Sequence, residues 1–292
     1  MSSGGPLGRG GMGTVWRAED VLLGCQVAVK DVELPDVPAG ADPAALRARA
    51  LREARAAARL NHPGVVTLHD VVEADGRLLL VMELVQAPSL RELVGRSGPL
   101  APAAAARVGL DLVDALDAAH RAGIVHHDVT PANVMVAGGG RAKLADFGIA
   151  SLQEDTPRTL TAATGAVDPT VVFGSLPYVA PEQARGEAAG PAADLWALGA
   201  TLWFAVEGAA PFERGGPAAT LGAILYDPPG QPVRAGPLGP VLLALLDKDP
   251  ARRPPAAAVG RRLEPLAAPS PAATVPLSGP TEVLPLPGPP PG

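Results

Sequence analysis

The sequence predicts an α+β protein of two lobes, a small lobe rich in β-strands followed by a larger and mainly helical lobe. Short runs of β-forming residues recur over positions 1–86, and longer helical patterns follow over 87–268. Residues 269–292 are rich in Pro, Ser, Thr and Gly and carry almost no charge, which predicts a disordered tail.

The small lobe is expected to hold several strands and one helix. The helix is predicted over 43–60, because Asp42 is a good N-cap, Pro43 suits the first helical position, and Asn61–Gly64 would end it. Very little sequence precedes the glycine-rich stretch near the N-terminus, so either the start is misassigned or a first strand is short and the small lobe less stable. The runs that predict strands are 14–18, 26–32, 65–72 and 77–85.

The large lobe is expected to be built from helices joined by loops. Short strands and loops are predicted over 124–150, and a Thr-rich loop over 153–170. The runs with helical periodicity are 101–122, 191–206, 217–226, 238–247 and 254–266.

Composition excludes several classes of protein. The net charge of −6 argues against nucleic acid as a main partner, because no basic face could neutralise a phosphate track. The single cysteine, Cys25, excludes an intramolecular disulfide framework and favours a reducing compartment. The longest apolar run, 195–206, is too short to span a bilayer, so we expect a cytoplasmic protein without a membrane span.

Lysine is scarce in this chain. Only Lys30, Lys143 and Lys248 occur among 24 Lys and Arg residues. Where arginine is used so consistently for positive charge, a lysine indicates a place that needs a compact ammonium.

A glycine motif occurs close to the N-terminus, with Gly8, Gly10 and Gly13 in the pattern G-x-G-x-x-G. With 34 glycines in the chain, the motif alone is weak. A dinucleotide-binding unit would need a helix after it, whereas a strand is expected there. The remaining interpretations are a glycine loop between antiparallel strands, whose amides can lie over phosphates, or an ordinary glycine-rich N-terminus.

The run Val27–Lys30 supports the phosphate interpretation. Ala28 and Lys30 would share one face of a strand, where Ala28 leaves room for a flat ring and Lys30 can reach a phosphate. Glu53 falls within the apolar stripe of the predicted helix, so its burial would need a cation, and Lys30 is the natural partner. The alternative is a solvated lysine at a strand end.

Three further polar residues suit catalysis. Asp128 and Asn133 lie in His126–Asn133, and Asp146 follows thirteen residues after the Asn in Asp-Phe-Gly. Two Asp and one Asn on short loops suit a general base and a Mg²⁺ site with room for substrate phosphates. Each alone could be a loop-capping residue, but loop capping does not explain their joint order and spacing.

With three more motifs, the chain resembles the protein kinase superfamily from Leu7 to about Leu266. These motifs are Ala180–Glu182, Asp194–Gly199 and Asp249–Pro254, and all follow in the family order. The chain looks most like a bacterial Ser/Thr kinase of the eukaryotic-like type, which implies the two-lobed kinase fold with ATP and Mg²⁺ (or Mn²⁺) as cofactors.

At the phosphate end, the resemblance implies that the glycine motif forms a lid over ATP. Lys30 would contact the α- and β-phosphates and be held by Glu53. At the adenine end, Met82 looks like the gatekeeper, and Glu83 and Val85 offer backbone hydrogen bonds. The full set of implied ATP-binding residues is Leu7, Gly8, Gly10, Gly13, Val15, Ala28, Lys30, Met82, Glu83, Val85 and Met135.

The resemblance also implies catalytic and metal-binding roles. Asp128 would orient and deprotonate the substrate hydroxyl, and Asn133 and Asp146 would hold Mg²⁺. Glu182 and Arg253 would form a buried ion pair.

Two further positions follow from the same resemblance. Asp194 would brace the catalytic loop. Ser175 lies in a docking loop that resembles the Ser/Thr-kinase version, so protein serine or threonine is the expected acceptor, with self-phosphorylation included.

Two positions depart from the family pattern. Thr130 stands where the family usually has a Lys that steadies the γ-phosphate, and losing such a contact costs about 10²–10³ in rate when it is uncompensated. His127 replaces an Arg that commonly binds a phosphate on the activation loop. The alternative function is therefore a pseudokinase-like scaffold that binds nucleotide with weak or no transfer.

The tail has two interpretations as well. It is either an inert end or a docking segment in which Thr274 and Thr281 become phosphorylated and recruit a phosphothreonine-binding partner.

Overall fold

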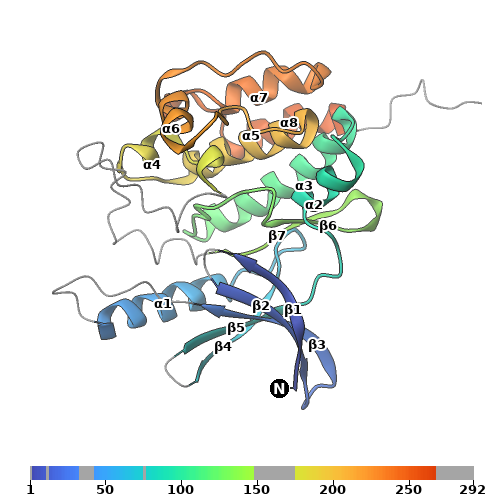
Figure 1. Cartoon of the computed structure of the whole chain (residues 1–292), viewed down its shortest axis with the longest axis vertical. Helices are drawn as coiled ribbons and strands as arrows, with labels where there is room; N and C mark the ends of the chain where they lie inside the picture. Colours follow the sequence, from blue (N-terminus) through green and yellow to red (C-terminus); the bar gives the residue numbers. More distant parts are fainter. Residues whose placement is uncertain (1, 11–12, 33–42, 75–76, 148–174, 268–292) are drawn as a thin grey trace, which may run out of the picture.

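The structure is a computed structural model, and it describes residues 2–10, 13–32, 43–74, 77–147 and 175–267. It has the two lobes that the sequence predicts (Figure 1). An antiparallel sheet and one helix form the small lobe, and helices form most of the large lobe. The Thr-rich segment at 153–170 and the tail at 269–292 lie outside the described residues.

The small lobe is built on a five-stranded antiparallel sheet with the order β1-β2-β3-β5-β4. In chain order its strands span Ser2–Gly10, Gly13–Asp20, Cys25–Val32, Leu68–Ala74 and Arg77–Glu83. The predicted helix is α1, Pro43–Ala57, which lies between β3 and β4 in the sequence and beside the sheet in Figure 1.

Side chains along each strand point alternately to the two faces of this sheet. On one face, Ala28 of β3 packs in a cluster with Met82 of β5 and Ala54 of α1. On the opposite face, Val27 packs with Val81. Because successive side chains of a strand point to opposite sides, Lys30 shares the face of Ala28.

The first strand is longer than the sequence predicts. Residues 1–5 offer no apolar lead-in, yet β1 spans nine residues and pairs with β2 along its length, with two shifts of register. Ladder hydrogen bonds come from the backbone, so a segment rich in Ser and Gly can pair with β2 without apolar side chains.

The fourth strand begins later than predicted. β4 begins at Leu68, whereas Val65 and Val66 pair with Leu144 of the large lobe. The Val66 amide donates to the Leu144 carbonyl at 2.9 Å, and the Leu144 amide donates to the Gly64 carbonyl at 2.8 Å. A run of β-forming residues does not specify its partner, and here the partner lies in the other lobe.

Five predicted helices of the large lobe are confirmed. They are α3 (Pro102–Arg121), α5 (Pro191–Glu207), α6 (Pro217–Tyr226), α7 (Gly239–Leu245) and α8 (Ala256–Ala267). A two-stranded ribbon, β6 (Val134–Val136) and β7 (Ala142–Leu144), lies beside them. Short 3₁₀ turns span Gly138–Gly140, Leu176–Tyr178, Gly236–Leu238 and Pro250–Arg252 and are labelled η1, η3, η4 and η5.

The structure has two helices that the sequence did not predict, α2 (Leu90–Ser97) and α4 (Pro181–Ala184). The start of α2 carries a sequence signal, the capping box of Ser89 and Glu92. The Glu92 amide donates to Ser89 Oγ at 3.2 Å, and the Ser89 amide donates to Glu92 Oε2 at 2.9 Å.

Helix α5 forms the centre of the large lobe and is buried along most of its length. It packs against α3 and α7. Gly199 stands at the α7 contact, where an added Cβ would lie 2.7 Å from Cβ of Leu245. Glycine at this position therefore lets the two helices pack closely. Because α5 is buried and packed on two sides, it is a rigid support for the loops beside it. None of the helices in the described ranges is long and apolar enough to cross a membrane.

Candidate active site

The glycine motif lies at the turn between β1 and β2. Gly10 and Gly13 are the last cross-strand pair, and residues 11–12 between them lie outside the described part of the chain. Gly13 has a φ of +122°, which residues with side chains rarely adopt. The motif therefore sits between antiparallel strands, which is inconsistent with a dinucleotide-binding βαβ unit.

The next strands bring the expected adenine and phosphate contacts together. Val15 of β2 pairs with Lys30 of β3, and Ala28 pairs with Met82 of β5. Lys30 is buried in spite of its charge, whereas Leu7 of β1 is 45 % exposed. Ala28, Lys30 and Met82 thus share one face of the sheet.

The buried ammonium of Lys30 has an acidic partner across the lobes. Lys30 Nζ lies 3.0 Å from Asp146 Oδ2, with the two side chains 5 % and 18 % exposed. Asp146 has a φ of +67°, a conformation that non-glycine residues seldom adopt outside functional sites. Glu53 is half-buried on α1, next to Ala54. Its contact with Lys30 stays a prediction.

Asp194, fully buried on α5, braces the segment before Asp128. Its Oδ2 accepts hydrogen bonds from the His126 amide at 2.8 Å and from His120 Nε2 at 2.7 Å, and its Oδ1 accepts one from the His127 amide at 2.8 Å. Burial acts to raise the pKa of Asp194, but these hydrogen bonds and the two imidazoles, His120 and His126, outweigh it and lower the pKa. The ionised carboxylate therefore helps to hold His127 at a φ of +65°.

The imidazole of His126 joins this segment to Asp146. His126 Nδ1 accepts a hydrogen bond from the Asp128 amide at 3.2 Å, and its Nε2 donates to the Ala145 carbonyl at 2.8 Å. The ring also meets Phe147 edge to face, with centroids 4.5 Å apart. The loops that carry Asp128 and Asp146 are therefore held as one unit.

Asp128 and Asn133 are joined directly. Asn133 Nδ2 donates to the carbonyl and to Oδ2 of Asp128, both at 2.9 Å. The Asn133 carbonyl accepts a hydrogen bond from the Ala145 amide at 2.8 Å, which brings Asn133 beside Asp146. Because Nδ2 of Asn133 donates its hydrogen bonds to Asp128, the side-chain oxygen of Asn133 can accept a cation.

This donor set fits Mg²⁺. Carboxylate and amide oxygens are the ligands that Mg²⁺ prefers, and Mg²⁺ commonly takes only one or two from the protein. Within the described ranges, no three His, Cys, Asp or Glu side chains converge into a cation site. A Mg²⁺ ion held by Asn133 and Asp146 would therefore take its other ligands from phosphate and water.

The expected adenine contacts lie where the chain passes between the lobes. Glu83 is the last residue of β5, and Val85 follows it, half-buried. Met135 is the central residue of β6 and forms an isolated bridge with Ser89, just before α2. The β6–β7 ribbon of the large lobe therefore lies next to the segment that leaves the small-lobe sheet.

Thr130 lies on the same loop as Asp128 and is only 3 % exposed. Its carbonyl accepts a hydrogen bond from the Asn133 amide at 3.0 Å. A threonine hydroxyl can donate a hydrogen bond to phosphate but brings no positive charge.

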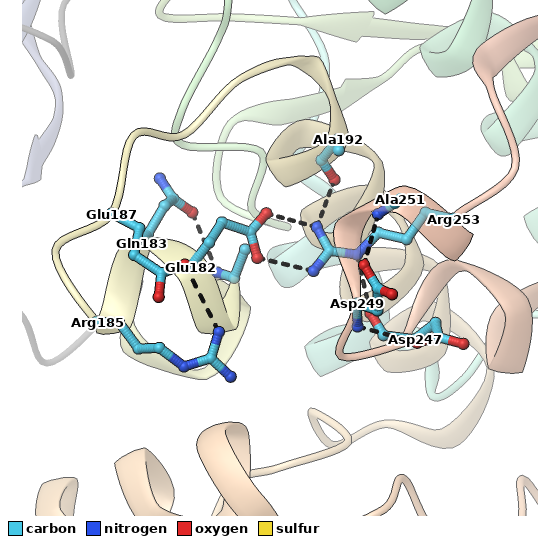
Figure 2. A network of polar contacts seen from close by, with 10 residues as sticks. Glu182, Gln183, Arg185, Glu187, Ala192, Asp247, Asp249, Ala251 and Arg253 are labelled. Atoms are coloured by element: carbon cyan, nitrogen blue, oxygen red, sulfur yellow. Dashed lines mark hydrogen bonds and ion pairs between the residues drawn. The ribbon is translucent and has the colours of Figure 1, made fainter.

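The motifs Ala180–Glu182 and Asp249–Pro254 meet in the large lobe (Figure 2). Arg253 Nη1 and Nη2 donate to the two carboxylate oxygens of Glu182 at 2.6 and 2.7 Å, and their side chains are 0 % and 5 % exposed. Arg253 also donates to the carbonyls of Ala192 and Asp247 at 2.8 and 2.9 Å. This pair secures α4, directly after the loop of Ser175, to the rest of the lobe.

Two residues that support the loop of Asp128 are not predicted from the sequence. His120 holds Asp194, and Thr201 Oγ1 donates to the Val129 carbonyl at 3.1 Å. The buried hydroxyl of Thr201 in the apolar helix α5 is the signal that could have revealed it, because a buried polar group needs a partner.

Comparison with known proteins agrees with this geometry. The chain matches the family described as "Protein kinase domain" over residues 1–259. It is 37 % identical over 250 residues to serine/threonine-protein kinase PknD of Mycobacterium tuberculosis, covering 85 % of this chain and 36 % of PknD. It is 37 % identical over 230 residues to the probable serine/threonine-protein kinase PknB of Corynebacterium glutamicum, covering 77 % and 34 %.

A third relative is similar to the same extent. Serine/threonine-protein kinase PknA of Mycobacterium tuberculosis is 38 % identical over 232 residues, covering 76 % of this chain and 50 % of PknA. The chain thus spans between one third and one half of the length of these relatives. With its motifs in order and its fold in two lobes, the chain belongs to the protein kinase domain family.

Proposed function

We propose that this protein is a serine/threonine protein kinase that transfers the γ-phosphate of ATP to hydroxyl groups of proteins. The observation that carries the proposal is the linked set Asp128, Asn133 and Asp146, with Lys30 Nζ 3.0 Å from Asp146. Relatives named as serine/threonine-protein kinases support it.

In the proposed reaction, Asp128 orients the acceptor hydroxyl and takes its proton as the oxygen bonds to the γ-phosphorus. The bond between that phosphorus and the bridging oxygen of ADP breaks, and ADP leaves. Lys30 binds the α- and β-phosphates and balances their charge. Asn133 and Asp146 would hold Mg²⁺ (or Mn²⁺), and the ion would supply further positive charge at the phosphates when bound.

The proposed acceptor is a serine or threonine. The support is the run from Ser175 to Tyr178, which resembles the docking loop of Ser/Thr kinases. Ser175 is half-buried just before η3, and Tyr178 is buried.

Transfer of labelled phosphate from ATP, with the protein itself and casein as acceptors, tests the proposal. We expect Asp128→Asn to lower kcat by about 10³-fold, because the variant keeps the loop but removes the base. Asp117→Asn, an exposed carboxylate on α3, is the matched control and should match the wild type. Wild-type transfer no greater than that of Asp128→Asn would overturn the proposal.

A second candidate is a nucleotide-binding scaffold, and Thr130 is the observation that favours it. If the missing charge limits phosphate transfer, Thr130→Lys should raise kcat by about tenfold in the enzyme. If the wild type binds ATP without transferring phosphate under Mg²⁺ or Mn²⁺, the scaffold is the correct function.

We further propose that activity does not require phosphorylation of the activation loop. The reason is His127, whose imidazole lacks the fork of donors with which the guanidinium of arginine binds phosphate. The candidate threonines Thr156, Thr159, Thr161, Thr164 and Thr170 lie outside the described residues. Treatment with a phosphatase should leave the rate unchanged, and loss of activity would contradict this proposal.

The proposal also includes a cytoplasmic location and a role for the tail. Cys25 is a free, exposed thiol, which suits a reducing compartment. Thr274 and Thr281, outside the described residues, are proposed self-phosphorylation sites for a phosphothreonine-binding partner. Mass spectrometry after incubation with ATP should find phosphate on them, and its absence would remove this part.

A further inference from the structure

An ion pair joins the two lobes at the point where the chain leaves the small-lobe sheet. Lys143 Nζ donates to both carboxylate oxygens of Glu83, at 2.6 and 2.7 Å. Glu83 ends β5 and Lys143 is the central residue of β7, so the pair connects the two sheets. The side chains are 30 % and 28 % exposed, which is less than in most pairs at the protein surface.

The same carboxylate is also held from a second side. The Thr67 amide donates to Glu83 Oε2 at 3.2 Å, and the Glu83 amide donates to the Thr67 carbonyl at 2.8 Å. Burial acts to raise the pKa of Glu83, but the hydrogen bonds from Lys143 and Thr67 outweigh it, so the net effect is to lower the pKa. Glu83 is therefore ionised and held at its amide and at its side chain.

The contacts around Lys143 close a ring. The neighbouring Leu144 pairs with Gly64 and Val66, and this segment leads directly to Thr67. Across the ribbon, Lys143 pairs in register with Met135. Glu83 and Met135 are thus tied to the same lysine-bearing strand, one by an ion pair and one by the β-ladder.

We infer that Lys143 is a positioning residue for the adenine end of the nucleotide site. By holding the Glu83 carboxylate, it fixes the distance between the Glu83 backbone carbonyl and Met135, which are both among the expected ATP-binding residues. This inference rests on the proposed function and on the expected backbone contact of Glu83 with adenine, in which the Glu83 carbonyl would accept a hydrogen bond from the adenine amine.

The inference predicts an effect on base selection. The 6-amino group of adenine donates a hydrogen bond, whereas O6 of guanine accepts one. A carbonyl held in place therefore favours adenine, because guanine would set two acceptors against each other. Loosening Glu83 should weaken ATP binding more than GTP binding.

The scarcity of lysine supports this role. The chain uses arginine at most cationic positions, yet it has a compact ammonium here. Arg141, two residues away on the same ribbon, pairs with Asp111 at 3.3 Å and is 66 % exposed. Arg141→Gln thus removes a cation from the ribbon without touching Glu83, which makes it the matched control.

The test compares Lys143→Met, Lys143→Arg and Arg141→Gln by phosphate transfer and by binding of fluorescent mant-ATP with Mg²⁺. For Lys143→Met, we expect KM for ATP and Kd for mant-ATP to rise about three- to tenfold, with kcat within about twofold. KM for GTP should change less. Lys143→Arg should restore part of the affinity, and Arg141→Gln should behave as the wild type.

The double variant Glu83→Gln, Lys143→Met measures the coupling between the two side chains. It should bind ATP no more weakly than Lys143→Met alone, because the two residues act through one contact. An unchanged KM in a Lys143→Met protein that melts as the wild type does would overturn the inference. An equal loss for ATP and GTP, or a fall in kcat instead of a rise in KM, would overturn it as well.

The wild-type arm separates this inference from the proposed function. A wild type that binds mant-ATP but transfers no phosphate overturns the kinase proposal, and the Kd values still decide the role of Lys143. A wild type that binds no nucleotide overturns both.

Discussion

The two lobes bury apolar side chains in different ways. In the small lobe, the sheet divides them into two thin clusters, one around Ala28 and Met82 and one around Val27 and Val81. The large lobe has one continuous core, centred on α5 and including Trp196. The large lobe therefore holds the loop of Asp128 on a rigid support, whereas the small lobe relies on contacts with the large lobe for its position.

Charge is also handled differently in the two regions. Glu182 and Arg253 form their pair entirely inside the large lobe. The pairs that join the lobes, Lys30 with Asp146 and Lys143 with Glu83, are partly open to solvent. The Lys30–Asp146 pair, whose carboxylate is 18 % exposed, can exchange partners when phosphates bind, whereas the Glu182–Arg253 pair cannot be opened without a large loss of stability.

The largest effect is expected from breaking the buried pair of the large lobe. Arg253→Met leaves the Glu182 carboxylate buried without its cation and should lower the free energy of unfolding by about 3–5 kcal/mol. Urea denaturation measures this loss. Arg121→Gln, which breaks an exposed pair with Asp117, should cost less than about 1 kcal/mol. Similar losses in the two variants would show that burial does not distinguish them.

Replacing one buried leucine by alanine in each lobe tests the difference in packing. Leu198 of α5 and Leu80 of β5 are both almost completely buried. Leu198→Ala should cost about 4 kcal/mol, because the continuous core cannot close around the cavity, and Leu80→Ala about 2 kcal/mol, because a thin cluster can relax. Thermal and urea unfolding of both variants provide the measurement. A larger loss for Leu80→Ala would reverse the comparison.

The smallest effect concerns a lysine in the large lobe. Lys248 Nζ donates to the carbonyls of Ala223 and Ile224 at the end of α6 and lies 3.8 Å from the ring centroid of Phe212. Burial lowers the pKa of Lys248 to about 8 in spite of the nearby Asp227. Between about pH 8 and the ordinary lysine pKa near 10.5, the unfolded chain binds a proton that the folded chain has released.

The stability that Lys248 contributes should therefore rise with pH over this range. We expect the free energy of unfolding of the wild type, relative to Lys248→Met, to increase by about 1 kcal/mol from pH 8 to 10 after allowance for solvent screening. Denaturation of both proteins across this range measures the difference. A flat or falling difference would contradict the prediction.

Much of the fold follows from local patterns. The five large-lobe helices and most small-lobe strands agree with prediction because their periodicity and end signals are strong. The prediction that β4 begins at Val65 was wrong, because Val65 and Val66 are equally suited to pairing within the sheet or with Leu144. The length of β1 was underestimated because backbone pairing with β2 needs no apolar side chains.

For the candidate site, the motif residues could be identified, but their contacts could not. Nothing near Lys30 in the sequence points to Asp146, and the hydrogen bond between His120 and the buried Asp194 joins residues 74 positions apart. Such contacts depend on how whole elements pack, which a local pattern does not encode.

The order and spacing of the motifs therefore suffice to identify the family, and they predict a general base and cation ligands, since these depend on residue types along the chain. The tertiary structure alone decides which charges meet. It pairs Lys30 with Asp146, Lys143 with Glu83 and Arg253 with Glu182, because each contact needs two distant segments brought within hydrogen-bond distance.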